Sequence, residues 1–503
     1  MKLARVYSRA GIGIAAPLVT VEVHVSNGLP SLSIVGLPEA AVKESKDRVR
    51  GAILNSHFEF PAKKIIINLA PADLPKEGGR FDLPIALGVL LASEQIIADE
   101  IEDYEFTAEL ALSGELRPVP GVMPVAIQSK AAGKKLVIPL ENAAEASLVA
   151  REKIYPANNL LAVCQHLAGQ KKLTKSQGSP QTLPTTDLDM CDVKGQYNAK
   201  RALEIAAAGG HSLLMVGPPG TGKTMLASRL PDILPDMSEQ EAAESAAVLS
   251  ISSLGFLPEQ WGRRVFRAPH HTASGVALVG GGSNPKPGEI SLAHNGVLFL
   301  DELPEFSRQV LEVLREPLES GRIVISRAAR QAEFPAKFQL IAAMNPCPCG
   351  YYGDSNGACN CSVEKVNRYR AKLSGPLLDR IDMHVEVPRL KNLNQLSVQN
   401  SDKIETSQEI RYRVKLARAR QVERGVNCNA QMSVKQLDKL CQLGVEENDF
   451  LMQSIDKLNL SNRAYHRILK IAKTIADLDG KENIELSHVA EALNFRRLDR
   501  KSR

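Results

Sequence analysis

The sequence predicts an α/β protein with a parallel sheet and a phosphate-binding loop at its centre, a helical region after it and a smaller α/β domain before it. Three observations support this prediction. An apolar segment at residues 213–216 runs into a loop of the form GxxxxGK[ST], after which helical character begins. Two later apolar segments, 297–300 and 338–344, end in polar residues, as buried parallel strands do. Beyond residue 407 the apolar spacing is helical, with little strand signal.

Length and composition set broad limits. A chain of 503 residues is too long for one core, so roughly two to four domains are expected. The charged fraction of 24% and the hydrophobic fraction of 44% describe an ordinary globular protein, and the net charge of +5 permits an anionic partner without arguing for one. No apolar run approaches the ~20 residues of a membrane span, and the basic, then apolar start has no clear cleavage site. We expect a cytoplasmic protein with no membrane partner.

Residues 1–170 are expected to form the first α/β unit. In order, its expected elements are a strand at 19–25, a helix at 39–54, a buried strand at 65–69, an apolar helix from residue 83 and an apolar segment at 136–139. Ser26-Asn27-Gly28, directly after the first strand, predicts a hairpin-type turn.

A polar segment separates this unit from the rest. Residues 171–188 are rich in Pro, Gly, Ser and Thr and have almost nothing to bury, which is linker composition. A P-loop unit at 189–390 follows, and 391–503 is expected to be helical, with a long basic helix at 407–424.

The phosphate-binding loop carries the first chemistry. Its glycines let backbone N–H groups close around phosphate oxygens, Lys223 would reach the β- and γ-phosphates, and the Thr224 hydroxyl would coordinate Mg²⁺. The alternative is a chance match in a Gly/Pro loop, although every fixed position of the motif is present after a predicted strand. The residues expected to bind ATP and magnesium are Gly217, Gly220, Thr221, Gly222, Lys223, Thr224 and Asp301.

Two acids follow the apolar segment at 297–300. Asp301 would hold Mg²⁺ through water, and Glu302 would polarise the attacking water. An exposed acidic strand end is the alternative, although two acids directly after apolar residues are costly in a core and natural at the mouth of a parallel sheet. The next strand ends at Asn345, whose amide can hydrogen-bond both the water and the γ-phosphate. Asn-Pro alone is a weak signal, because it also starts turns.

Half of the eight cysteines form a cluster of the pattern C-x-C, nine residues, C-x-C, within an insertion at 347–361. The four are Cys347, Cys349, Cys359 and Cys361. Four thiolates in two pairs suit a tetrahedral, structural Zn²⁺, and the loop between the pairs has glycines that allow it to fold back. C-x-C is tighter than the usual C-x₂-C, so a set of free buried thiols is the alternative.

Together these motifs resemble the ComM/YifB type of magnesium-chelatase-related AAA+ ATPases over essentially the whole chain. The matching segments are Asp192-Val193-Lys194-Gly195-Gln196, the P-loop, His270-His271-Thr272-Ala273-Ser274, Asn345-Pro346-Cys347-Pro348-Cys349-Gly350 and the segment around Arg380. The resemblance implies an AAA+ P-loop core with an α-helical lid, preceded by a Lon-protease-like (ribosomal S5 domain 2-like) domain. In that domain Arg80 and Met123 stand where the Lon pattern has its serine and lysine, so proteolysis is not expected.

The resemblance also implies roles for single residues. Asn345 would be sensor 1, and Arg380 would be the arginine finger that acts on a neighbouring subunit's nucleotide; an Asp–Arg surface pair is the alternative for Arg380. Arg463 stands at the sensor 2 position, with Arg467 one turn further on as a rival. The expected catalytic residues are therefore Glu302, Asn345, Arg380 and Arg463.

The function that this resemblance implies is an ATP-driven DNA branch-migration helicase, linked to natural transformation and assembled as a hexamer. A helix 2 insert around 266–282 and a hairpin at 322–336 would face the pore and its DNA. Two other functions stay open: the motor subunit of a metal chelatase, and a MoxR-like protein remodeller without DNA contact. The first domain and the cysteine cluster favour the DNA motor, and the basic helix at 407–424 supports it weakly.

Overall fold

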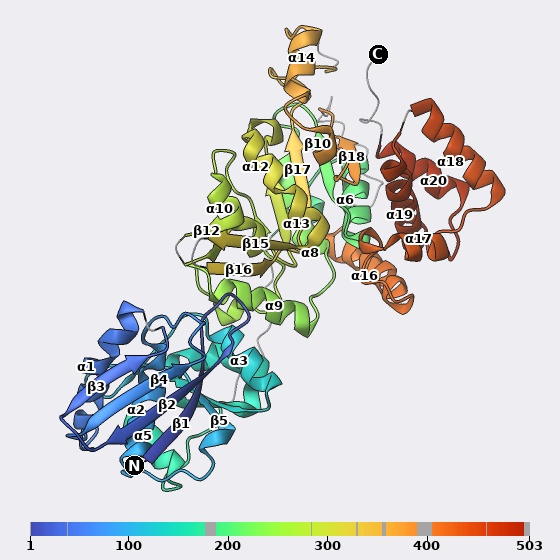
Figure 1. Ribbon diagram of the computed structural model, residues 1–503. Coiled ribbons are helices and arrows are strands. Elements are labelled where there is room, and N and C mark those ends of the chain that lie inside the picture. The colour runs from blue at the N-terminus through green and yellow to red at the C-terminus, as the bar shows by residue number, and fades with distance from the viewer. Residues whose placement is uncertain are drawn as a thin grey trace.

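The computed structural model describes residues 2–37, 39–176, 188–282, 284–327, 330–354, 359–389, 405–458 and 460–496. The chain builds an N-terminal α/β part, a central part around a parallel sheet, and a helical part beside that sheet (Figure 1). Most of the expected linker 171–188, and residues 391–404 of the expected lid, lie outside the described residues. No described helix combines the length and the apolar character that crossing a bilayer requires.

The N-terminal part contains a seven-stranded mixed sheet. Its strands, in spatial order, are β3 (Ser31–Val35), β4 (Lys64–Ala70), β2 (Leu18–Ser26), β1 (Lys2–Arg9), β5 (Tyr104–Phe106), β8 (Lys135–Pro139) and β9 (Ile154–Ala157). The hairpin-type turn predicted at Ser26-Asn27-Gly28 is wrong, because this turn leads from β2 to β3 and β4 lies between those two strands. β2 is flanked instead by β4 and by β1, a strand that was not predicted from the sequence.

Helices cover this sheet. They are α1 (Ala40–Asn55), α2 (Asp82–Ala92), α3 (Val122–Ala131), α4 (Ala143–Ala150) and α5 (Leu160–Leu167), with a small ladder of β6 (Glu109–Leu110) and β7 (Leu116–Arg117). α2 is buried along almost its whole length and lies so close to the sheet that a Cβ at Gly88 would come within 2.5 Å of Val23 Cγ2. Burial raises the pKa of Asp82, which opens this helix, and Arg48 Nε binds its carboxylate at 2.7 Å.

The central part is built on a five-stranded, all-parallel sheet. Its spatial order is β11 (Phe266–Arg267), β14 (Val297–Leu300), β17 (Gln339–Met344), β10 (Leu213–Val216) and β18 (Met383–Glu386). The helices around it are α6 (Tyr197–Gly209), α7 (Lys223–Ser228), α8 (Leu230–Ile233), α9 (Glu239–Ser250), α12 (Arg308–Val313), α13 (Arg315–Ser320), α14 (Val363–Arg370) and α15 (Gly375–Leu378). Because all five strands run the same way, the residues that follow them meet at one edge.

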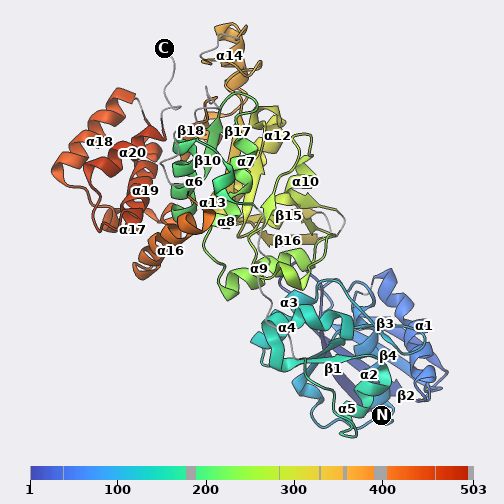
Figure 2. The same ribbon diagram turned by 180° about the vertical axis from the view of Figure 1, so that it is seen from behind.

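Two insertions lie on the side of this sheet that faces the N-terminal part (Figures 1 and 2). One holds α10 (Gly275–Val279), β12 (Gly280–Gly281), β13 (Lys286–Pro287) and α11 (Glu289–Leu292); the other is the hairpin of β15 (Arg322–Arg327) and β16 (Arg330–Pro335). The hairpin predicted at 322–336 is therefore confirmed. Residues 328–329 at its tip lie outside the described residues.

The N-terminal part docks on α9. Gly121 N donates to the Ser250 carbonyl at 3.2 Å and Met123 N donates to Ser250 Oγ at 3.4 Å, and the Met123 side chain is buried against Ala246 and Ala247. Arg80 is buried nearby, where its guanidinium donates to the Pro120 carbonyl at 2.9 Å and burial lowers its pKa to about 10.

The C-terminal part is helical. It comprises α16 (Ser407–Glu423), α17 (Val434–Leu440), α18 (Val445–Leu458), α19 (Asn462–Leu478) and α20 (Leu486–Asn494). α16 is the predicted basic helix, and most of its cations bind groups of the same chain. Arg411 and Lys415 pair with Asp236, Arg413 with Glu204 and Glu405, Arg424 with Asp477, and Arg418 donates to the carbonyls of Ala207 and Ala208. This helix therefore gives no support to a DNA-binding surface.

Candidate functional site

The loop after β10 has the backbone that the motif predicted. Gly220 and Gly222 have φ angles of +75° and +87°, which favour glycine. Gly217 is enclosed, since a Cβ there would lie 2.1 Å from the Val387 carbonyl oxygen. Its N–H donates to the Met344 carbonyl at 3.2 Å, which fixes the start of the loop to the end of β17.

Lys223 and Asn345 meet at this edge. Lys223 Nζ donates to the carbonyls of Gly217 and Pro218 at 2.7 and 2.9 Å and to Asn345 Oδ1 at 3.2 Å. Burial lowers the pKa of Lys223, and the neighbouring carboxylates of Asp301 and Glu302 oppose that shift. The ammonium group thus lies inside the loop, beside the amide that the sequence proposed as its partner in phosphate binding.

The end of β14 supplies oxygen ligands. Thr224 Oγ1 donates to Asp301 Oδ2 at 2.7 Å, and Asp301 Oδ1 accepts the Glu302 N–H at 2.9 Å. A hydroxyl and a carboxylate side by side are the type of ligands that Mg²⁺ takes in phosphoryl-transfer sites. Glu302 has a φ of +51°, a conformation that is uncommon for a residue with a side chain and that often marks functional sites.

One residue of this site was not predicted to act there. His271 Nδ1 lies 3.2 Å from Glu302 Oε2, and the His271 ring lies 4.1 Å from the His270 ring, centroid to centroid. His271 follows β11, the neighbour of β14 in the sheet, and its loop continues into α10. The signal that could have found it is the His-His motif one strand away from the Asp-Glu pair.

The two predicted arginines lie elsewhere. Arg380 lies three residues before β18, and Arg463 is exposed near the start of α19. Both line a cavity of about 720 Å³ together with Ser212, Gly296 and Gln339, which precede or begin β10, β14 and β17. This is the amino edge of the sheet, opposite to the P-loop, and a four-residue strand separates the edges by ~13 Å. Arg463 therefore lies away from the P-loop of its own chain, and its sensor 2 role stays a prediction.

Arg380 and Arg467 are held by contacts within the chain. Arg380 Nη2 lies 2.6 Å from Glu319 Oε1, and its Nη1 donates to the Pro376 carbonyl at 2.8 Å. Arg467 pairs with Asp382: burial would raise the pKa of that carboxyl, but the charge of Arg467 and hydrogen bonds from His211 and Ser212 hold it well below its usual range. Arg467, the rival for sensor 2, is thus part of a structural ion pair.

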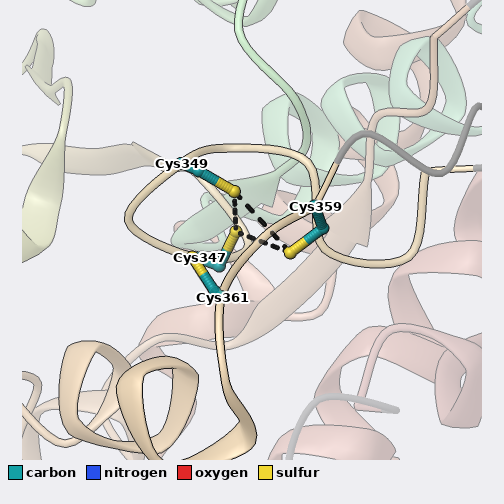
Figure 3. Close-up of side chains that lie close together, drawn as sticks. All are labelled: Cys347, Cys349, Cys359 and Cys361. Atoms are coloured by element: carbon teal, nitrogen blue, oxygen red, sulfur yellow. Dashed lines mark hydrogen bonds between the residues drawn. The ribbon is translucent and has the colours of Figure 1, made fainter.

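The structure brings the four clustered cysteines together (Figure 3). The Sγ atom of Cys347 lies 3.3 Å from that of Cys349 and 3.8 Å from that of Cys359, and all four sulfurs lie within 4.8 Å of one another. A tetrahedral zinc with Zn–S bonds of ~2.3 Å needs sulfurs ~3.8 Å apart, so the donor set and its spacing fit this ion. Residues 355–358 of the intervening loop lie outside the described residues.

Comparisons with known proteins show the family to which the chain belongs. Family models described as "Magnesium chelatase, subunit ChlI", "Subunit ChlI of Mg-chelatase" and "Magnesium chelatase, subunit ChlI C-terminal" match residues 189–395, 21–142 and 404–496. Competence protein ComM of Haemophilus influenzae is 53% identical over 99% of this chain and 98% of its own length. The chain belongs to the ComM/YifB type of magnesium-chelatase-related proteins.

Other relatives extend the match. The YifB proteins of Salmonella typhimurium and Escherichia coli are 51% and 49% identical, each over 99% of this chain and 98% of the relative. This chain is thus a magnesium-chelatase relative with mixed α/β content. Because magnesium chelatase subunit ChlI is an AAA+ protein, the relationship implies ATP and Mg²⁺ as ligands of the P-loop.

We expect His271 to hold Glu302 in a fixed position in this ComM/YifB-type protein. In His271→Ala the carboxylate gains rotational freedom, so kcat for ATP hydrolysis should fall by roughly tenfold. KM for ATP should stay unchanged, because His271 makes no contact with the P-loop among the described interactions. His271→Asn, which retains a donor, should recover part of kcat. Steady-state kinetics measure both constants, and a raised KM at unchanged kcat would contradict this role.

Proposed function

We propose that this chain is an ATPase that assembles into a hexameric ring and moves on DNA. The observation that supports this most is the division of the candidate site between two edges of one sheet. Lys223 and Glu302 lie at the carboxyl edge, and Arg380 and Arg463 lie at the amino edge. A ring in which the amino edge of one subunit faces the carboxyl edge of the next would bring both arginines to a neighbour's nucleotide.

Each residue at the carboxyl edge has a role in the proposed hydrolysis. Backbone N–H groups of the loop and Lys223 would bind the phosphates, while Thr224 and Asp301 would hold Mg²⁺, which would neutralise charge on the phosphate oxygens. Glu302 would orient the attacking water and accept its proton, and Asn345 would hydrogen-bond that water. Arg380 and Arg463 of the adjacent subunit would stabilise charge on the transferred phosphoryl group.

The DNA would pass through the pore, in contact with the two insertions. They lie side by side, since a Cβ at Gly280 would come within 3.0 Å of Ile325 Cδ1. Lys286 is exposed on the first insertion, and the hairpin carries arginines at 322, 327 and 330. Cations on loops that read no base edges give binding that tolerates any sequence and weakens with salt. The competing role for Arg327 or Arg330 is contact with a neighbour's nucleotide.

The cellular role that we infer rests on the relatives. Because a protein named for competence matches the full chain, we propose that the motor drives branch migration during recombination of incoming DNA in natural transformation. In this proposal residues 189–390 form an AAA+ core and 391–503 a lid. Residues 1–170 form a Lon-protease-like domain without protease activity, joined to the core by the linker 171–188, and the protein works in the cytoplasm.

We also propose that the cluster of Cys347, Cys349, Cys359 and Cys361 holds a structural Zn²⁺, because its four sulfurs have tetrahedral spacing and leave no ligand position for a substrate.

A metal chelatase motor and a protein remodeller share the ATPase core with the proposed DNA motor. The measurable difference is the effect of DNA on ATP hydrolysis. DNA should change the rate of hydrolysis by a DNA motor, but not the rate of a chelatase motor or a protein remodeller.

Arg380 should act on a neighbouring subunit. Arg380→Ala should bind ATP yet hydrolyse it at least about a thousandfold more slowly, the lower end of the range for loss of an arginine finger. Mixing it with Lys223→Ala subunits should restore some hydrolysis at hybrid interfaces, measured as phosphate release across mixing ratios. Glu319→Ala, which removes the same ion pair but keeps Arg380, is the matched control and should stay active. The absence of rescue at every ratio would show that Arg380 acts in its own subunit.

The two insertions should couple DNA to hydrolysis. Replacing Lys286 and Arg330 together by alanine should lower DNA-stimulated ATPase and unwinding and leave basal ATPase intact, because the lost cations bind only the DNA backbone. The control is the double alanine variant of Lys435 and Lys439, two exposed lysines in or beside α17 that carry the same charge. A collapse of basal hydrolysis would instead place Lys286 or Arg330 in the subunit interface.

Protein purified without chelator should contain one Zn²⁺ per chain, because all four thiolates can bind a single ion at once. Elemental analysis by mass spectrometry measures this directly. The double variant of Cys359 and Cys361 to serine should lose the metal, whereas Cys191→Ser, at a cysteine outside the cluster, should keep it. A zinc content near zero in the unaltered protein would refute the metal site.

A further inference from the structure

The cysteine cluster lies against the ATP-binding loop. Cys347 is fully buried and stands two residues after Asn345, the residue that accepts the hydrogen bond from Lys223. The chain then turns back, since the Gly350 N–H donates to the Cys347 carbonyl at 3.0 Å and the Tyr352 N–H lies 3.3 Å from Cys347 Sγ. Two of the four cysteines are therefore part of the turn that directly follows Asn345.

This turn approaches the P-loop at Gly350. Gly350 is buried with a φ of +87°, and a Cβ built there would lie 2.7 Å from Cδ and 3.2 Å from Cγ of Pro219. Cδ of proline is bonded to the backbone nitrogen, so the ring cannot rotate away, and an added side chain at residue 350 or a displacement of the turn toward the ring must move the backbone of the loop. The backbone around Pro219 is the part that would surround the phosphates.

The same turn is tied to the sheet at its other end. The Met344 carbonyl accepts from Gly217 N, and Tyr369, after the second pair of cysteines, hydrogen-bonds the backbone of Asn345. Burial raises the pKa of Tyr369 to about 12, although this hydrogen bond acts to lower it. The hydroxyl therefore stays neutral in its contact with the sheet. Asn345 and Pro219 are thus positioned by one short turn, and the cysteine cluster closes that turn on itself.

We infer that the cysteine cluster with its metal is a brace that positions the P-loop and Asn345 for ATP. This rests on the proposal that the cysteines hold Zn²⁺ and that the loop binds ATP. It goes beyond both, because it assigns the metal a role in nucleotide affinity although no cysteine is expected to touch the nucleotide. In the absence of the metal the turn loses its cross-link, and the loop backbone loses the support at Pro219.

Two glycines of the same loop provide a matched pair of variants. Gly350 and Gly353 have φ angles of +87° and +80°, so alanine strains the backbone similarly at either position. At Gly353 a Cβ would meet no atom within 4 Å, whereas at Gly350 it would meet Pro219. Both variants keep all four cysteines.

The test measures binding of a fluorescent, non-hydrolysable ATP analogue together with zinc content. Gly350→Ala should keep one zinc per chain and bind the analogue at least about tenfold more weakly than Gly353→Ala, because small displacements of binding groups cost this much or more. Stripping zinc from the unaltered protein with a chelator should weaken binding similarly, and zinc added back should restore it. This second measurement requires no variant to fold.

Equal affinity of the two glycine variants would overturn the inference, and so would analogue binding that is unchanged when zinc is stripped. Neither readout involves DNA. A protein whose ATP hydrolysis ignores DNA but whose nucleotide affinity follows zinc would therefore refute the DNA motor and support the brace.

Discussion

The parallel pairing of β10 with both of its neighbours determines where every candidate residue lies. Leu213 lies opposite Ile341 on one side and Met383 on the other, so three strands from distant parts of the chain end in step. Their carboxyl ends gather the P-loop and Asn345 within hydrogen-bond distance, and their amino ends gather Arg380 and the groups around it. Because the two sets lie at opposite edges, the arginines could complete a nucleotide site only in the proposed ring, where they would meet the P-loop of a neighbouring subunit.

Much of the carboxyl edge could be predicted from the sequence, since it depends on short segments that combine a buried strand with a fixed motif. Lys223, Asp301 and Asn345 each follow such a strand, and the register then brings their side chains together. The clustering of the four cysteines could likewise be predicted from a short segment of sequence, because all four lie within residues 347–361. What could not be predicted depends on tertiary placement: the edge at which Arg463 lies, and the approach of His271 to Glu302 across two strands.

The errors have physical causes of the same kind. The turn after Ser26 has hairpin composition, but β4 is rich in isoleucine and β1 begins at the chain start, and these two strands occupy both sides of β2. The basic helix looked suited to DNA, yet Asp236 and Asp477 take up several of its cations. A charge pattern alone does not tell whether its partner is a nucleic acid or another segment of the same chain.

In the proposed DNA motor, ATP hydrolysis at this site is coupled to DNA. The most direct test is the steady-state rate of ATP hydrolysis by the full-length protein with no DNA, with single-stranded DNA and with a branched four-way junction, each at two salt concentrations. We predict a higher rate with DNA, a smaller stimulation at higher salt, and no hydrolysis above background in Glu302→Gln. A rate that is the same with and without every DNA would contradict it.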